Sequence, residues 1–282
     1  MSWLKGLLLG LVQGLTEFLP VSSSGHLALT SALLNGGESL EEAYFSFFVL
    51  LHLATLASVI VYYRRDVVLL IKSFFSLVGK LFKGKFRLDE YTEGERTVVM
   101  IIIASVPLVA AALIDGYIEA LSSHRRVIGI LLILNGGLLL LSDYLSARQR
   151  RKNEEGKDLG RLGPLDALLI GLCQFGAIVP GISRSGSTIT GGIAVGLKRE
   201  TAVKFSFLLS MPAILGANIL KLPDMIKSPA ASAGAPAIIA GVTAAFIAGF
   251  AALGLLNFIA KKERFRYFAF YCFAVGLLAL AL

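Results

Sequence analysis

Two short stretches place polar and ionisable side chains inside regions that are otherwise apolar. The first, EFLPVSSSGHLALT at residues 17–30, contains Glu17, a run of three serines and His26. The second, VPGISRSGSTIT at residues 179–190, contains Arg184 between two serines. An ionisable group inside a membrane costs about 2.5–3.5 kcal/mol on insertion scales, and it is kept where it has a partner or a task. We therefore expect these three ionisable residues to carry function.

The serine cluster of the first stretch has the pattern of a helix start. Pro20 ends one helix, and the residues after it supply caps and hydroxyl groups to the next helix. A helix start presents unpaired N–H groups and the positive end of the helix dipole, so it attracts anions such as phosphate. The residues that we expect to contact an anion here are Ser22, Ser23, Ser24 and Gly25.

The second stretch repeats this design and adds a positive charge. A Pro-Gly pair opens the turn, and the guanidinium group of Arg184 is a planar fork that suits phosphate oxygens. The neighbouring residues expected to contact substrate are Ser183, Ser185, Gly186 and Thr188. If the two turns meet, two helix starts converge on one point and form a phosphate pocket.

Glu17 needs a different task, because a bare carboxylate would repel phosphate. Gln13 lies four residues before it, so the two side chains share one face of a helix, and we expect Gln13 to contact substrate. We expect Glu17 to hold a divalent metal ion or to act as a base. The serines of both stretches and His26 also have a purely structural alternative. Single serines in membrane helices often bond to their own backbone, and a histidine can be a packing residue.

Other polar residues of the apolar regions carry less information. His52 and His124 belong to no motif, and we assign them no role. Asn135 and Asn218 are expected to form hydrogen bonds between helices.

Composition identifies an integral membrane protein. Of the 282 residues, 56% are hydrophobic and 16% are charged, and the mean hydropathy is +0.76; soluble domains contain roughly 45–50% apolar residues. The net charge of +8 would suit nucleic acid in a soluble chain. In a membrane protein, basic residues collect instead on the cytoplasmic side. We therefore expect membrane lipid around the protein and no nucleic-acid partner.

Five or six segments are long and apolar enough to cross a bilayer, which takes about 20 residues. They are 44–63, 97–118, 127–145, 205–222, 236–260 and 265–282. Two further regions, 3–34 and 165–197, each consist of two short apolar pieces separated by Pro, Gly and Ser. Such pieces can enter and turn back where their broken backbone is buried in protein or faces a polar cavity. We predict an all-α membrane protein with two re-entrant helical hairpins.

The two hairpins resemble each other, which indicates a duplication. GLVQGLTEFLPVSSSG at 10–25 and GLCQFGAIVPGISRSG at 171–186 align without a gap. We predict a first repeat over 1–145, a cytoplasmic linker over 146–164 and a second repeat over 165–282, each repeat with one hairpin and three spans. An odd number of crossings inverts the second repeat, and most Lys and Arg residues then lie on the cytoplasmic side.

Both motifs together resemble those of the undecaprenyl-diphosphate phosphatases, the bacitracin-resistance family of bacterial inner membranes. The resemblance is carried by QGLTE with LPVSSSGH and by PGISRSGSTITGG, and it covers nearly the whole chain. It implies that the terminal phosphate of undecaprenyl diphosphate is removed at the outer face of the membrane with a divalent cation, Mg²⁺ or Ca²⁺. This reaction regenerates the lipid carrier of peptidoglycan synthesis.

The resemblance also assigns roles to residues. The family's catalytic serine and histidine fall on Ser23 and His26, and its phosphate-binding arginine falls on Arg184. Its first motif has Glu or Gln, three residues and then Glu, which fall on Gln13 and Glu17. Because members with Glu at the first position have a second carboxylate, the metal or base role depends here more heavily on Glu17. The nucleophile stays open between the serine, the histidine and water.

Two further expectations concern partners and an alternative function. The partners expected are a polyprenyl diphosphate, membrane lipid and, as an option, a second copy in a homodimer. A transporter or flippase for a phosphorylated lipid or an anion is the alternative function, because inverted repeats with broken helices are also the plan of secondary transporters.

Overall fold

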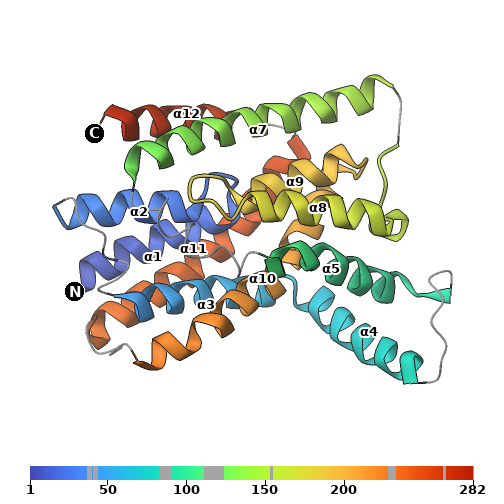
Figure 1. The fold of residues 1–282 in the computed structure, drawn as a ribbon, viewed down its shortest axis with the longest axis horizontal. Helices are drawn as coiled ribbons and strands as arrows, with labels where there is room; N and C mark the ends of the chain where they lie inside the picture. The colour runs from blue at the N-terminus through green and yellow to red at the C-terminus, as the bar shows by residue number, and fades with distance from the viewer. Residues whose placement is uncertain are drawn as a thin grey trace.

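The structure, a computed structural model, describes residues 1–36, 40, 44–82, 90–110, 124–152, 155–227, 233–262 and 265–281. Apart from one isolated bridge between Lys157 and Leu197, the regular structure of these residues is helical (Figure 1). The helices are α1 (Trp3–Phe18), α2 (Ser23–Leu34), α3 (Phe45–Tyr62), α4 (Arg64–Phe82), α5 (Glu93–Val109), α7 (Arg125–Arg151), α8 (Pro164–Gly176), α9 (Arg184–Ala194), α10 (Arg199–Lys227), α11 (Ala235–Lys262) and α12 (Arg266–Ala281). The predicted all-α class is confirmed.

Four of the described helices are long and apolar enough to cross a membrane, namely α3, α7, α10 and α11. The last expected span corresponds to α12, which has 16 residues. The expected span over 97–118 begins in α5, and its part beyond residue 110 lies outside the described residues. The chain is thus a multi-pass membrane protein.

The two predicted hairpin regions each form a pair of short helices. In the first, α1 and α2 are separated by the turn around Pro20, and in the second, α8 and α9 are separated by residues 177–183. A serine caps the second helix of each pair. Ser22 Oγ accepts a hydrogen bond from the Gly25 N–H at 3.3 Å, and Ser183 Oγ accepts one from the Gly186 N–H at 3.1 Å. These serines satisfy N–H groups that a helix start leaves unpaired.

Each hairpin packs against a helix from the other half of the chain. α1 lies along α11, and a Cβ added at Gly10 would overlap the carbonyl oxygen of Gly241. α8 lies along α5 in the same way, with Gly171 against the backbone of Ala104. Small residues allow backbones to approach this closely in a membrane. The inverted repeat stays a prediction, and this reciprocal packing supports it.

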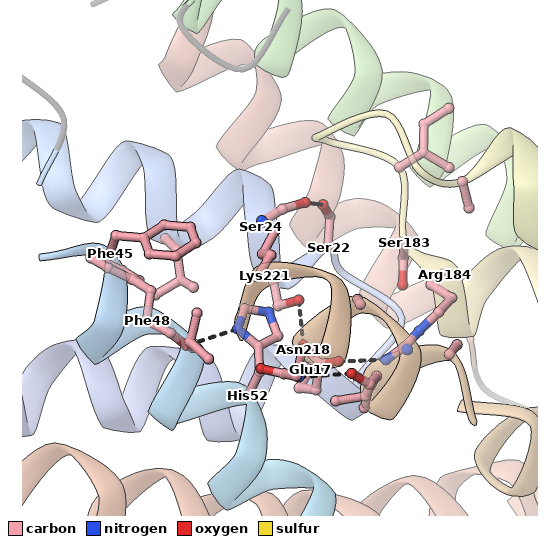
Figure 2. Close-up of a pocket in the computed structure, with 18 residues that line it drawn as sticks. Glu17, Ser22, Ser24, Phe45, Phe48, His52, Ser183, Arg184, Asn218 and Lys221 are labelled. Carbon is pink, nitrogen blue, oxygen red and sulfur yellow. Dashed lines mark hydrogen bonds and ion pairs between the residues drawn. The ribbon is translucent and has the colours of Figure 1, made fainter. Parts of the chain in front are cut away.

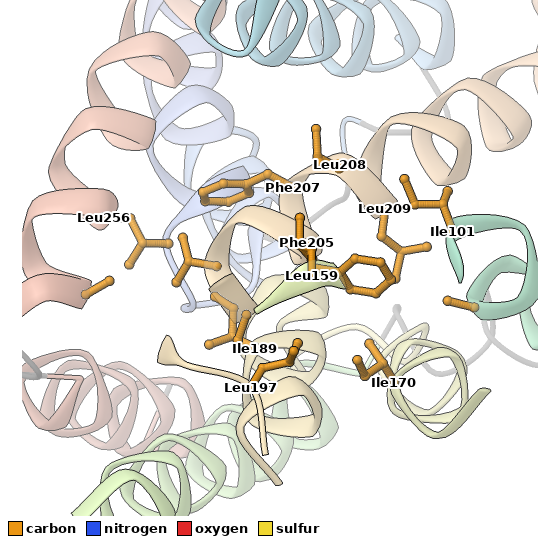
Figure 3. Close-up of a cluster of buried hydrophobic side chains, with 14 of the residues drawn as sticks. Ile101, Leu159, Ile170, Ile189, Leu197, Phe205, Phe207, Leu208, Leu209 and Leu256 are labelled. Carbon is orange, nitrogen blue, oxygen red and sulfur yellow. The ribbon is translucent and has the colours of Figure 1, made fainter. Parts of the chain in front are cut away.

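α7 and α12 form one long edge of the bundle, and a central apolar cluster lies among the helices below them (Figure 1). α7 and α12 run side by side (Figure 1) and touch where Gly129 meets Gly276. The cluster in Figure 3 gathers around Phe205 and Phe207 of α10 and includes side chains of α5, α8, α9 and α11. The cluster includes side chains from the carboxyl-terminal half of α9, and Arg184 lies at the amino-terminal end of the same helix.

The polar segment between the halves is more helical than the sequence pattern suggested. α7 continues to Arg151, so residues 146–151 of the expected linker belong to it. The run ARQRR consists of good helix formers, and positive charge is favourable at the carboxyl end of a helix. After this helix, Lys157 forms an ion pair with Asp166 at 2.9 Å, which ties the rest of the segment to α8.

Candidate functional site

An ion pair joins the two hairpins at the centre of the candidate site (Figure 2). Glu17 lies in the last turn of α1 and Arg184 is the first residue of α9, and a guanidinium nitrogen donates to the carboxylate. Glu17 is only 6% exposed, whereas 22% of the Arg184 side chain is exposed. The structure therefore brings together the two ionisable residues that the separate motifs contain.

The carboxylate of Glu17 has two further donors. Ser23 Oγ donates to it at 2.7 Å and Gln13 Nε2 donates to it at 3.0 Å. Since the amide nitrogen of Gln13 faces the carboxylate, its Oε1 atom points elsewhere and is buried without a hydrogen-bond partner among the described residues. Buried polar atoms without a partner are rare and call for an explanation such as an ion or water.

The tips of the hairpins are held together by direct hydrogen bonds. Ser22 Oγ accepts the Gly181 N–H at 3.1 Å, in addition to the cap bond within its own helix. Ser22 has a φ of 74°, a left-handed conformation that no other described residue except glycine adopts. Such strained conformations persist only where the surroundings enforce them, and they cluster at functional sites.

Asn135 of α7 forms a second bridge between the tips. Its Nδ2 donates to the Pro20 carbonyl at 2.9 Å, and its Oδ1 accepts the Ser183 N–H at 3.0 Å. The expected hydrogen bonding of Asn135 between helices is confirmed. Two helix starts thus converge on one point, as the paired motifs predict.

A cavity of about 330 Å³ opens beside this meeting point. One wall is apolar and comes from α2, α3 and α10, with Phe45, Phe48 and Ile214 among its residues. The polar and charged residues that line the cavity are Glu17, Ser22, Ser23, Ser24, His52, Ser183, Arg184, Asn218 and Lys221. The cavity therefore combines positive charge, hydroxyl groups and an apolar wall, which suits an anionic group attached to a lipid.

Several residues predicted to bind substrate, together with the predicted catalytic His26, lie outside the lining of the cavity. These residues are Gln13, Gly25, His26, Ser185, Gly186 and Thr188. Gly25 and Gly186 donate their N–H groups to the capping serines. Thr188 Oγ1 forms a hydrogen bond with the Ser206 hydroxyl at 2.6 Å and donates to the Arg184 carbonyl at 2.9 Å. Ser185 pairs with the hydroxyl of Ser183 at 3.0 Å. In this arrangement they shape the tips, and their contact with substrate stays a prediction.

His26 is buried behind the tip of the first hairpin. Its Nδ1 lies 2.7 Å from the Ser22 carbonyl oxygen, and its Nε2 lies 2.9 Å from the Tyr271 hydroxyl. Both ring nitrogens are therefore engaged by protein groups.

Three residues of the cavity were missed from the sequence. His52 and Lys221 received no role, and Asn218 was expected to bond between helices but bonds to the Ile214 carbonyl of its own helix at 2.7 Å. That expectation was wrong, because an asparagine side chain can reach the carbonyl four residues earlier. His52 did carry a usable signal, since it is an ionisable residue inside an expected span.

The donor atoms near Glu17 fit a hard divalent cation. The Glu17 carboxylate and Ser23 Oγ supply oxygens, which Mg²⁺ and Ca²⁺ prefer. The described residues contain no group of three or more His, Cys, Asp or Glu side chains placed to bind a metal. A cation here would therefore depend on a single carboxylate and on oxygens from substrate or water.

Comparisons with known proteins identify the family of the chain. A family model described as bacitracin resistance protein BacA matches residues 6–278. An undecaprenyl-diphosphatase from Alkaliphilus metalliredigens is 39% identical over 279 residues, which cover 98% of this chain and 97% of the relative. One from Syntrophotalea carbinolica is 40% identical with the same coverage, and one from Korarchaeum cryptofilum is 39% identical over 99% of this chain and 98% of the relative. The chain therefore belongs to the bacitracin resistance protein BacA family.

Proposed function

We propose that this protein is a membrane phosphatase that hydrolyses undecaprenyl diphosphate to undecaprenyl phosphate and inorganic phosphate. The observation that carries the proposal is the Glu17–Arg184 ion pair at the point where two capped helix starts converge beside an apolar wall. The names of the relatives support the reaction and the substrate, and the family name implies a role in bacitracin resistance.

The cavity matches the two chemical parts of such a substrate. Arg184, Lys221 and the serine hydroxyls supply charge and hydrogen bonds for the diphosphate. The apolar wall with Phe45 and Phe48 can take the first isoprene unit, and the rest of the prenyl chain stays in lipid between the spans. A substrate bound at this site thus has its charged diphosphate in the cavity and most of its prenyl tail in the lipid.

Substrate binding changes the partner of Arg184. The guanidinium group turns from Glu17 towards the phosphate oxygens, where it stabilises the charge that develops as the terminal phosphoryl group is transferred. Glu17 is then free to accept a proton. The two helix starts are fixed in place by their caps and by Asn135, so the positive ends of their dipoles need no rearrangement to stabilise the transition state.

Ser23 is the protein nucleophile that the geometry favours. Its hydroxyl already donates to Glu17 at 2.7 Å, the arrangement in which a carboxylate activates a hydroxyl group. Attack by Oγ on the terminal phosphorus breaks its bond to the bridging oxygen, releases undecaprenyl phosphate and passes the hydroxyl proton to Glu17. Water then cleaves the phosphoserine and gives inorganic phosphate. A water molecule activated by the same carboxylate would reach the same products in one displacement.

A divalent cation, Mg²⁺ or Ca²⁺, is part of the proposal. Glu17 and Ser23 Oγ would hold it together with substrate oxygens. When bound, it supplies positive charge that offsets the negative charge of the diphosphate.

We further propose the bacterial inner membrane as the location, with the cavity on the outer face. The excess of Lys and Arg in the segments expected to be cytoplasmic supports this orientation. The physiological role would be recycling of the lipid carrier for cell-wall synthesis. A homodimer stays a prediction.

The experiment measures phosphate release from undecaprenyl diphosphate by the purified protein in detergent, with and without a chelator. We expect metal-dependent release that Arg184→Ala abolishes and that Arg126→Ala, the loss of an exposed arginine at the start of α7, leaves intact. If folded wild-type protein releases no phosphate, the phosphatase proposal fails. Movement of undecaprenyl phosphate across proteoliposomes, measured in parallel, would then favour the transporter or flippase.

A further inference from the structure

Tyr271 of the last helix reaches the first hairpin. Its hydroxyl lies 2.9 Å from His26 Nε2, although 245 residues separate the two in sequence. The two rings are also stacked, with their centroids 5.5 Å apart and their planes 9° from parallel. α12 is fixed in this place by its close packing on α7, which itself holds both hairpin tips through Asn135.

The hydrogen bonds determine which nitrogen of His26 carries the proton. The Ser22 carbonyl oxygen can only accept, so Nδ1 must carry the hydrogen that it donates over 2.7 Å. In the neutral ring, Nε2 is then an acceptor and takes the hydrogen of the Tyr271 hydroxyl. Nδ1 carries the donated hydrogen, and the lone pair of Nε2 accepts the Tyr271 hydroxyl hydrogen. His26 therefore has no free nitrogen that could accept a proton from a group in the cavity.

The same contacts continue to the centre of the site. His26 holds the carbonyl group of Ser22, the residue with the left-handed φ of 74°. Ser22 is among the residues that line the cavity, and its hydroxyl accepts the Gly181 N–H from the second hairpin at 3.1 Å. A continuous chain of hydrogen bonds thus runs from α12 through the first tip to the second.

We propose that Tyr271 is a positioning residue for the phosphatase site and that it acts through His26. The tyrosine fixes the tautomer and orientation of the imidazole, the imidazole holds the strained Ser22 backbone, and Ser22 keeps the two tips in register so that Glu17 and Arg184 meet. In this arrangement, His26 holds the Ser22 backbone in place, and Glu17 is the group that accepts the proton in the cavity. The inference rests on the proposed function.

The test starts from Tyr271→Phe, which keeps the stacked ring and removes only the hydroxyl. We expect kcat for phosphate release to fall about tenfold while KM changes less than twofold, because the tips lose alignment rather than charge. Tyr267→Phe is the matched control, since this tyrosine lies one turn earlier on α12 and is 59% exposed. It should match wild type. Melting temperature and gel-filtration profile check that each variant is folded.

A double-mutant cycle separates a shared path from two independent effects. In a His26→Gln background, Tyr271→Phe should cause no further loss, because the hydroxyl has lost its partner. Multiplicative losses, or a Tyr271→Phe variant within twofold of wild type, would overturn the proposal. A histidine that serves as the base would give a second signature, a far larger loss for His26→Gln than for Tyr271→Phe.

A spectroscopic readout keeps the inference testable if the proposed function fails. The chain has three histidines, so ¹⁵N-histidine NMR can assign His26 by the signal that His26→Gln removes. We expect a proton on Nδ1 and a hydrogen-bonded, unprotonated Nε2 whose shift changes in Tyr271→Phe and not in Tyr267→Phe. An Nε2-protonated ring, or an unchanged shift, would refute the contact whatever the activity of the protein.

Discussion

Replacement of Asn135 by leucine should loosen both hairpin tips at once. Asn135 is fully buried in α7, where its one side chain pairs with the Pro20 carbonyl at 2.9 Å and the Ser183 N–H at 3.0 Å. Leucine has a similar volume, so the variant creates little empty space. It does leave two buried backbone groups, the Pro20 carbonyl and the Ser183 N–H, without their hydrogen-bond partner. Each stranded group costs about 1–3 kcal/mol, which gives about 2–6 kcal/mol in total.

The assay is unfolding in detergent by heat or denaturant, followed by phosphate release from the folded fraction. Ser142→Ala is the matched control on the same helix, since the buried Ser142 hydroxyl has no hydrogen-bond partner within the described part of the chain. We expect that control to be as stable as wild type or more stable, while Asn135→Leu loses stability and activity together. An Asn135→Leu variant with wild-type stability and activity would show that α7 does not hold the tips.

Three further predictions test the packing, the pH response and the cation site. Gly10→Ala should lower the free energy of unfolding by about 1–3 kcal/mol, because the added methyl group overlaps the backbone of α11. Gly137→Ala is the control for melting curves and should leave stability unchanged, because its methyl group meets no atom within 4 Å. Burial alone would raise the pKa of Glu95, but the Lys80 ammonium group at 2.7 Å and further hydrogen bonds lower it to about 2. Its contribution is therefore present above pH 4.5 and lost as the pH falls towards 2, and acid unfolding of Glu95→Gln should show a weaker dependence over that range. Gln13→Glu should lower the concentration of Mg²⁺ or Ca²⁺ needed for half-maximal activity, because it adds a second carboxylate beside Glu17; an unchanged or higher requirement would place the cation elsewhere.

The hairpins and their meeting could be predicted because the relevant signals are local. Pro20 and the Pro-Gly pair at 180–181 break apolar segments too short to span a membrane, and a serine follows each break as a helix cap. The similarity of the two motifs then indicated that Glu17 and Arg184 belong to one site.

The remaining parts of the site depend on tertiary packing that leaves no local pattern. Which faces of α3 and α10 line the cavity is set by how these helices rotate against their neighbours, so the sequence could mark His52 as an ionisable residue inside a span but could not place it or Lys221 in the cavity. The contact between His26 and Tyr271 spans 245 residues and follows only from the packing of α12 on α7. The spacing of Thr188 is equally compatible with a substrate contact and with bonds to its own helix and Ser206, so the sequence alone could not distinguish the two.

The central claim is that residues from two distant hairpins form one catalytic site, and a cycle of Glu17→Gln, Arg184→Ala and the double variant tests it most directly. Initial rates of phosphate release from undecaprenyl diphosphate are measured for all three folded variants and for wild type. The account predicts that each single change removes most of the activity and that the double variant is no worse than the weaker single variant, because either change disables the same site. A single variant that keeps most of its activity, or a double variant whose loss is the product of the two single losses, would contradict it.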